Sequence, residues 1–212
     1  MKTYHKIQTV FLKNPNNGFK SILDGQFSKE EFNFLKKNKW IWTEKIDGIN
    51  IRILWKNGAL SFRGKTDGAI LPKQLDDKLK EKFKPDFFSN IFSETSNVCL
   101  YGEGYGVKIR KGGNYIQDDV DFILFDCLID GWWLKRESLE DISNKFNINI
   151  VPIIGEGTLL EAIELVRNGF KSTIAQNKDY IAEGLIMKPA VEMFNRKGER
   201  IISKIKYKDF ER

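Results

Sequence analysis

One short segment of the chain carries a lysine that could act as a nucleophile. Lys45-Ile46-Asp47-Gly48 lies between two stretches that alternate like strands, and Gly48 relieves backbone crowding in a tight loop. A free lysine has a pKa near 10.4, so only about one molecule in a thousand offers a neutral amine at neutral pH. Burial and nearby cations can lower such a pKa by about three units. The tetrapeptide alone also fits an ordinary turn.

Charged and aromatic residues follow this loop in an order that fits a single site. The segments are Arg63, Tyr101-Gly102-Glu103-Gly104, Phe125-Asp126, Glu183-Gly184-Leu185-Ile186-Met187-Lys188 and Ser203-Lys204-Ile205-Lys206. A glutamate among glycines, as in the second segment, is hard to explain as a plain surface residue. The two lysines of the last segment share one strand face, which could also be the solvent side of that strand.

Two of these segments leave alternatives open. Phe125 could pack in a core instead of stacking on a base, and Phe122, on the opposite strand face, is a rival for the stacking role. Strand alternation places Lys188 opposite Glu183 unless a bulge intervenes.

Two further polar groups have both a functional and a structural interpretation. Asn50 and Arg52 share a strand face that could contact phosphate or could simply be exposed. Lys108, Arg110 and Lys111 stand beside two glycines in a basic loop, which could touch triphosphate or nucleic acid or be merely solvated.

The elements that must position these residues follow from the hydrophobic pattern. We predict helices over 28–38 (with a capping box at Ser28), 77–83, 139–146 (capped by Ser138) and 159–168, and strands over 49–55, 59–63, 98–101, 122–128, 132–133, 185–187 and 201–207. Asn57-Gly58 predicts a tight hairpin turn between the first two strands. Short strands in hairpins with helices grouped between them indicate an α+β fold with largely antiparallel sheets.

The composition limits the class of protein. The 212 residues carry a net charge of +6, and cations crowd the last part of the chain, which suits a polyanionic partner or a solvated tail. No apolar run approaches the roughly 20 residues that span a bilayer, and the N-terminus lacks the apolar core of a secretion signal. Two cysteines and a single histidine predict neither a disulfide framework nor a zinc site. We therefore expect a cytoplasmic protein without a membrane partner.

Taken together, the ordered segments resemble the motifs of the covalent lysyl-nucleotidyltransferases, the superfamily of ATP-dependent DNA and RNA ligases and mRNA capping enzymes. The match runs from Lys45 to Lys206, and Asn50 resembles the RNA ligase branch. The resemblance implies an ATP-grasp-like nucleotidyltransferase domain with largely antiparallel sheets flanked by helices. It also implies a polynucleotide ligase that uses ATP with Mg²⁺ or Mn²⁺ and seals 5′-phosphate to 3′-hydroxyl ends.

The same resemblance implies which residues perform the first chemical step. Lys45 would attack the α-phosphate of ATP and become adenylylated, while Lys204 and Lys206 hold that phosphate. Glu183 would be the metal-facing carboxylate, directly or through water. Phosphoryl transfer depends mainly on alignment and charge neutralisation, so these cations and the metal ion should dominate catalysis.

The remaining implied residues bind the nucleotide. Glu44 would help to read adenine, and Phe125 would stack on it, with Asp126 in support. Glu103 would bind the ribose hydroxyls. Contacts to phosphate or metal-bound water are implied for Asn50, Arg52, Arg63 and Lys188.

The resemblance covers the nucleotidyltransferase domain alone, and the remaining expectations follow from this. Residues 1–212 are expected to form a single adenylyltransferase domain with no C-terminal oligonucleotide-binding or helical domain. Substrate binding would then rely on the basic surface of the domain or on a partner protein that supplies a clamp. The alternatives are a minimal DNA nick ligase acting on DNA ends, a capping-type guanylyltransferase and a decayed nucleic-acid-binding module.

Overall fold

The computed structural model describes residues 3–210, which form two compact units. The first unit contains residues 3–4, 47–151 and 175–177, and the second contains residues 5–46, 152–174 and 178–210. The expectation of a single domain over residues 1–212 stays a prediction. In the described part of the chain, no helix has the length and apolar character to cross a membrane.

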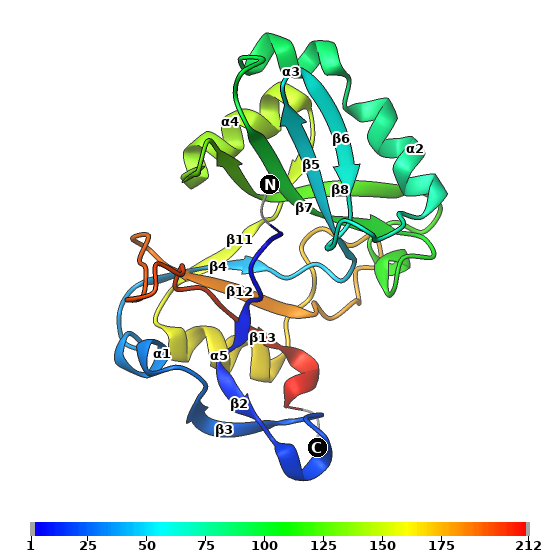
Figure 1. The fold of residues 1–212 in the computed structure, drawn as a ribbon. Helices are drawn as coiled ribbons and strands as arrows, with labels where there is room; N and C mark the ends of the chain where they lie inside the picture. The colour runs from blue at the N-terminus through cyan, green and yellow to red at the C-terminus, as the bar shows by residue number, and fades with distance from the viewer. Residues whose placement is uncertain (1–2, 211–212) are drawn as a thin grey trace. The chain divides into compact units, whose positions relative to one another are not determined.

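The first unit is built on a six-stranded sheet with the order β10-β8-β7-β5-β6, in which β9 pairs with β8 (Figure 1). Its elements are β5 (Ile49–Lys56), β6 (Ala59–Arg63), α2 (Lys73–Lys82), α3 (Pro85–Ile91), β7 (Val98–Gly106), η2 (Gly112–Asn114), β8 (Val120–Ile129), β9 (Trp132–Trp133), α4 (Arg136–Phe146) and β10 (Asn149–Ile150). The pair of β10 and β8 is parallel, and the other pairs of this sheet are antiparallel.

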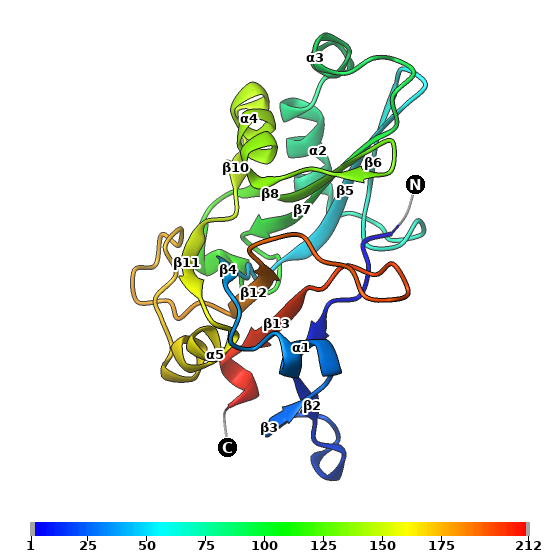
Figure 2. The same ribbon diagram turned by 90° about the vertical axis from the view of Figure 1, so that its left-hand side faces the viewer.

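Strand alternation gives this sheet two different faces. On β5, Ile51, Ile53 and Trp55 are at most 1% exposed and join a core with apolar residues of α2, α3 and α4. Helices α2 and α4 cover this apolar face (Figure 2). Each such buried side chain contributes about 2–3 kcal/mol of transfer free energy. The alternate residues, Asn50 and Arg52, therefore belong to the opposite face.

The second unit combines a five-stranded sheet, with the order β1-β13-β12-β4-β11, and the hairpin β2-β3. Its elements are β1 (Gln8–Thr9), β2 (Phe11–Lys13), η1 (Pro15–Asn17), β3 (Ile22–Phe27), α1 (Glu30–Phe34), β4 (Trp40–Glu44), β11 (Ile153–Gly157), α5 (Leu159–Asn168), β12 (Gly184–Pro189), β13 (Ser203–Lys206) and η3 (Tyr207–Asp209). Helix α5 packs its apolar side, including Leu159 and Ile163, against Leu185, Met187 and Ile205 of β12 and β13.

The predicted α+β class with largely antiparallel sheets is confirmed. The hairpin at Asn57-Gly58 is present, and Thr158 and Glu161 form the capping box that begins α5. The predicted cap at Ser28 is wrong, because α1 begins after Lys29 and the Ser28 hydroxyl donates to the carbonyl of Thr9.

Two other helix predictions are also wrong in detail. The helix predicted to begin at Leu139, with Ser138 as its cap, instead begins at Arg136 as α4. The residue at its N-cap position is Lys135. Pro85 does not only end a helix. It occupies the first turn of α3, where its missing N–H costs nothing, and this helix is absent from the prediction.

Candidate active site

Three strand ends of the second unit bring three charged side chains together. Lys45 follows β4, and its backbone N–H donates to the carbonyl of Gly184 at 2.9 Å. Its ammonium Nζ lies 2.5 Å from Glu183 Oε2. The Nζ of Lys206, on β13, lies 2.5 Å from Glu183 Oε1. One carboxylate thus joins the predicted nucleophile to one of the two late lysines.

The backbone at Gly184 is what lets Glu183 reach both lysines. Gly184 has φ +150°, and a Cβ there would lie 2.0 Å from the carbonyl oxygen of Ile205. Only glycine fits this close approach of β12 to β13. The positive φ interrupts the strand alternation just after Glu183, so the carboxylate shares a side of the sheet with Lys206.

Lys204 and Lys188 lie on the same sheet face as Lys206. Lys206 is paired with Gly184 and Lys204 with Ile186, and directly opposed residues of antiparallel strands point to one side. Lys188 is two residues beyond Ile186 on β12 and therefore shares that side. Regular strand alternation would place Lys188 and Glu183 on opposite faces of the sheet. The irregular backbone at Gly184 breaks this alternation, so it does not separate the two side chains.

The charges of this cluster alter two pKa values. Burial, followed by the neighbouring charges of Lys45 and Lys206, lowers the pKa of Lys204 to about 8. Burial alone would raise the pKa of Glu183, but the attraction of Lys45 and the hydrogen bonds from Lys206 and Lys45 lower it overall. The cluster therefore holds an excess of positive charge with a single ionised carboxylate, an arrangement suited to a phosphate group.

Replacing Lys204 by Met should remove a pH dependence of stability. The folded pKa of Lys204 is lowered to about 8 from 10.5, so between these values the unfolded chain binds more protons than the folded protein. Stability should therefore rise with pH across that window, by about 1 kcal/mol because the partly exposed side chain is screened. Urea unfolding at about pH 7 and about pH 10 should show the rise in the parent protein. The rise should persist in the control Lys39→Met, which replaces an exposed lysine. If it also persisted in Lys204→Met, the pH dependence could not come from Lys204.

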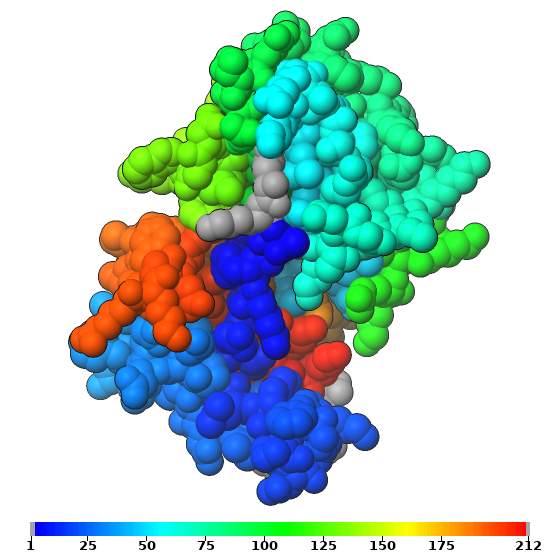
Figure 3. Space-filling view, in the orientation of Figure 1, coloured from blue at the N-terminus to red at the C-terminus, as the bar shows by residue number. Residues whose placement is uncertain are grey.

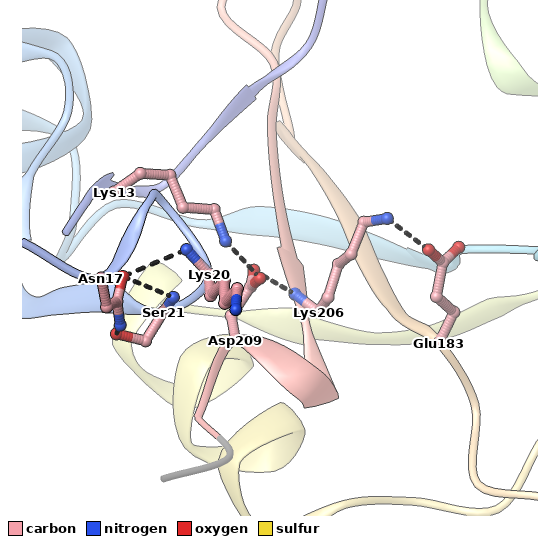
Figure 4. A network of polar contacts seen from close by, with 7 residues as sticks. All are labelled: Lys13, Asn17, Lys20, Ser21, Glu183, Lys206 and Asp209. Carbon is pink, nitrogen blue, oxygen red and sulfur yellow. Dashed lines mark hydrogen bonds and ion pairs between the residues drawn. The ribbon is translucent and has the colours of Figure 1, made fainter. Parts of the chain in front are cut away.

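A second network, not predicted from the sequence, fixes the end of β13. The buried carboxylate of Asp209 accepts hydrogen bonds from Lys13 Nζ at 2.5 Å and from the backbone N–H of Lys206 at 3.1 Å (Figure 4). Lys206 thus has its backbone held by Asp209 and its side chain held by Glu183. An acid three residues after a strand lysine gives no local signal, because its partner Lys13 is 196 residues away.

Asp209→Ala should destabilise the second unit and weaken the chemistry of the cluster. The change leaves Lys13, whose side chain is 30% exposed, and the N–H of Lys206 without their acceptor, and we expect a loss of about 2–3 kcal/mol in urea unfolding. Asp209→Asn keeps an acceptor for the N–H of Lys206 and should lose less. Equal losses in the two variants would show that the backbone hydrogen bond is unimportant.

Glu44 is almost fully buried, and both of its carboxylate oxygens accept hydrogen bonds. Ser172 Oγ donates to Oε1 at 2.5 Å, and the N–H and Oγ1 of Thr173 donate to Oε2 at 3.0 and 2.9 Å. The carboxylate therefore anchors the segment that carries Ser172 and Thr173, two residues that sequence reasoning missed. The predicted role of Glu44 in reading adenine stays a prediction.

The polar face of the sheet in the first unit gathers the other predicted residues. The register places Asn50 beside Glu103, and Arg52 between Arg63 and Tyr101. Directly opposed residues share a face. Because Ile51 and Ile53 face the helices, the predicted side chains all belong to the other side of the sheet.

Two atoms on this face lack the partner that a buried polar atom normally has. Arg52 is fully buried; its Nε donates to the carbonyl of Gly64 at 2.9 Å, and its Nη2 lies 2.6 Å from Asp67 Oδ1. Within residues 3–210, Arg52 Nη1 and Asn50 Oδ1 have no hydrogen-bond partner. Leaving such groups unpaired is costly, so each needs a partner from outside the chain, either water or a bound ligand. Arg63 is exposed on the neighbouring strand.

The two candidate stacking residues lie in different surroundings. Phe122 is fully buried in the core beneath the helices and packs edge-on against Phe83. Phe125 lies where the register of β7 and β8 shifts, is only partly buried and contacts the ring of Tyr4 edge-on. The adjacent Asp126 accepts a hydrogen bond from the Tyr4 hydroxyl at 2.7 Å. Phe122 is therefore excluded as a base-stacking residue, and Phe125 retains the prediction.

The donor set fits a metal ion that arrives with the nucleotide. Within residues 3–210, no group of three or more acidic, histidine or cysteine side chains could hold an ion by itself. Mg²⁺ commonly binds through one or two carboxylates together with substrate phosphates. Glu183 could supply that single carboxylate once a phosphate competes for its lysine partners.

Comparisons with known proteins point to one family. The family model described as RNA ligase matches residues 38–207. Three structures of Naegleria gruberi RNA ligase are similar to this chain. A mutant with ATP and Mn has 18% identity and a TM-score of 0.64, a mutant without ligand has 16% and 0.65, and the protein with PPi has 19% and 0.62. The chain is covered to 83–85% and spans 51–54% of those chains, about half their length.

Proposed function

Because the chain belongs to the RNA ligase family, we propose that it is an ATP-dependent RNA ligase that seals 5′-phosphate to 3′-hydroxyl ends through a Lys45–AMP intermediate. The observation that carries this proposal is the cluster in which Glu183 contacts both Lys45 and Lys206, with Lys204 on the same sheet face. A lysine that only stabilised the fold would not need two further cations beside it, since like charges disfavour one another.

The first step uses Lys45 as the nucleophile. Its Nζ first gives one proton to solvent and becomes an amine. The amine forms a bond to the α-phosphorus of ATP while the bond from that phosphorus to the pyrophosphate oxygen breaks, and Nζ then gives a second proton to solvent. Lys204 and Lys206 neutralise the charge on the transferred phosphate. Glu183 holds Lys45 Nζ until phosphate binds, and the Lys45–Glu183 pair must separate before the amine can attack.

In the later steps AMP passes from Lys45 to the 5′-phosphate of the RNA, and the 3′-hydroxyl then displaces AMP to form the phosphodiester. Mg²⁺ would neutralise charge on the phosphates, with Glu183 as its protein ligand, directly or through water. We infer that the polar face of the first unit binds the nucleotide, the role that the resemblance to the nucleotidyltransferases implies for its residues. Arg52 Nη1 and Asn50 Oδ1, which lack partners, would pair with phosphate oxygen and metal-bound water, respectively.

The remaining assignments follow the residue chemistry. Glu103 would accept hydrogen bonds from the ribose hydroxyls, and Phe125 would stack on adenine. Arg63 and Lys188 would bind phosphate. Glu44 would act on adenine recognition through the segment of Ser172 and Thr173 that its carboxylate anchors.

The test is the intact mass of the native protein after incubation with ATP and Mg²⁺. The expected result is a gain of one AMP that is lost in acid, because a phosphoramidate bond is acid-labile. GTP should give no gain, and a gain with GTP alone would indicate a capping-type guanylyltransferase instead. No gain with either nucleotide would favour a decayed binding module. Parallel sealing of nicks in RNA, DNA and hybrid duplexes would separate an RNA ligase from a DNA ligase.

A further inference from the structure

A short loop of the first unit presents three cations to solvent. The cationic loop, residues 107–111, follows β7 and carries Lys108, Arg110 and Lys111, all exposed. In the described part of the chain, none of the three side chains forms a hydrogen bond or an ion pair. The loop stands out from the surface in the space-filling view, in green near the right-hand edge (Figure 3).

The backbone of the cationic loop is strained where its charges sit. Lys108 has φ +60° and Arg110 has φ +49°, values in the left-handed region. Of the other four described non-glycine residues with positive φ, Asn57, Asp130 and Asn147 are residue types that tolerate this conformation, and Phe19 is not. Lysine and arginine do not share that tolerance. Strain kept at exposed positions that gain no contact within the chain points to a function outside it.

The strain is held in place by the residues between and beside the cations. Ile109 is 4% exposed and packs into the core beneath the helices, and its N–H donates to the carbonyl of Gly106 at 3.1 Å. The N–H of Gly112 donates to the carbonyl of Ile109 at 2.7 Å, and a Cβ on Gly112 would lie 2.5 Å from Gly106 N. With Ile109 fixed inward, the flanking Lys108 and Arg110 are directed outward on a defined backbone.

We propose that the cationic loop binds the backbone phosphates of the RNA substrate, an inference that rests on the proposed function. Exposed cations on a protruding loop suit a strand that passes along the surface with regularly spaced charges. The α-phosphate of ATP differs, because the cations assigned to it, Lys204 and Lys206, are partly buried in the second unit, and Lys206 is paired with Glu183. Contacts to phosphate carry no sequence information, so the loop contributes affinity without base preference.

The test is a double variant that removes the charges and relieves the strain, Lys108→Gly with Arg110→Gly. We expect thermal unfolding at an equal or higher temperature, because glycine adopts positive φ freely. We expect binding of a labelled 5′-phosphorylated single-stranded RNA to weaken about tenfold at low salt. The slope of log affinity against log salt should fall by about 0.7 per lost contact. A purely structural loop would give the opposite pattern, with lower stability and unchanged salt slope.

The matched control removes two exposed cations of the same unit, Lys56→Ala with Lys84→Ala. A slope change in the control equal to that of the loop variant would overturn the proposal. A shift in the ATP concentration needed for Lys45–AMP formation would assign the loop to the nucleotide and also overturn it. If the glycine variant unfolds, Lys108→Asn with Arg110→Asn keeps a residue type suited to positive φ. Absence of the adenylate in the parent protein would defeat the proposed function, while the salt slope would still report on the loop.

Discussion

Lys45→Arg and Lys45→Met should both form no detectable adenylate, a loss of at least about 10⁴-fold, because each removes the nucleophile. The arginine variant is the sharper of the two. It keeps a cation beside Glu183 and Lys206, yet a guanidinium stays protonated and cannot attack phosphorus. Loss of the adenylate in Lys45→Arg therefore isolates the amine from the charge. The measurement is the intact mass after incubation with ATP and Mg²⁺.

The matched control is Lys39→Met, an exposed lysine of the same unit whose partner is the exposed Glu156. It should form the adenylate as the parent protein does. A mass gain that persists in both Lys45 variants would place the nucleophile at another residue and would end the proposed mechanism.

Glu183→Gln should lower both the rate of adenylylation and the stability of the protein. Glu183 is 11% exposed at its side chain and neutralises Lys45 and Lys206. Removing its charge leaves the cluster without a counter-ion, and we expect the free energy of unfolding at about pH 7 to fall by about 2–3 kcal/mol. The rate of adenylate formation should fall about 100-fold, because the carboxylate assigned to the metal is lost.

The pH dependence of stability distinguishes the loss of the Glu183 charge from a change in packing at this residue. The folded pKa of Glu183 is lowered from 4.5, so its contribution is present above the unfolded pKa and disappears as the pH falls through the folded value. The difference in unfolding free energy between Glu183→Gln and the parent protein should therefore vanish in acid. Glu156→Gln, at an exposed ion pair with Lys39, should change stability by less than about 1 kcal/mol at any pH. A difference that persists in acid would mean that glutamine disturbs packing instead.

The parts of the fold that could be predicted are those with a local signal. The hairpin of β5 and β6 follows from alternating apolar residues around Asn57-Gly58, and α5 follows from the capping box at Thr158. Strands β1 and β2 have only two and three residues, too few to show a period. The longer strands β3 and β11 contain glycine and show no regular alternation of apolar and polar residues. Helix α3 was missed because Pro85 was interpreted only as the end of the preceding helix. Proline also favours the first turn of a helix, and this is where Pro85 lies.

In the candidate site too, features with a local sequence signal could be predicted, and features that depend on distant contacts could not. The charged residues could be chosen from their order along the chain, because few surface residues combine glycine neighbours with a charge. Which atoms pair could not be chosen, since Glu183 contacts two lysines only through the backbone conformation at Gly184. The donors to Glu44, Ser172 and Thr173, and the acceptor Asp209 were missed because their partners lie 128, 129 and 196 residues away. The roles of the individual residues stay predictions until the variants are measured.

The double engagement of Glu183 has a consequence for selectivity among small anions. Each of its oxygens already holds one lysine, so the carboxylate acts as a resident competitor that any incoming anion must displace. An anion with one or two charges gains little from that exchange, whereas a polyphosphate chelating a divalent ion brings enough charge to complete it. We therefore expect inorganic phosphate and sulfate to be poor inhibitors, and the enzyme to remain available for ATP in a cell rich in simpler anions.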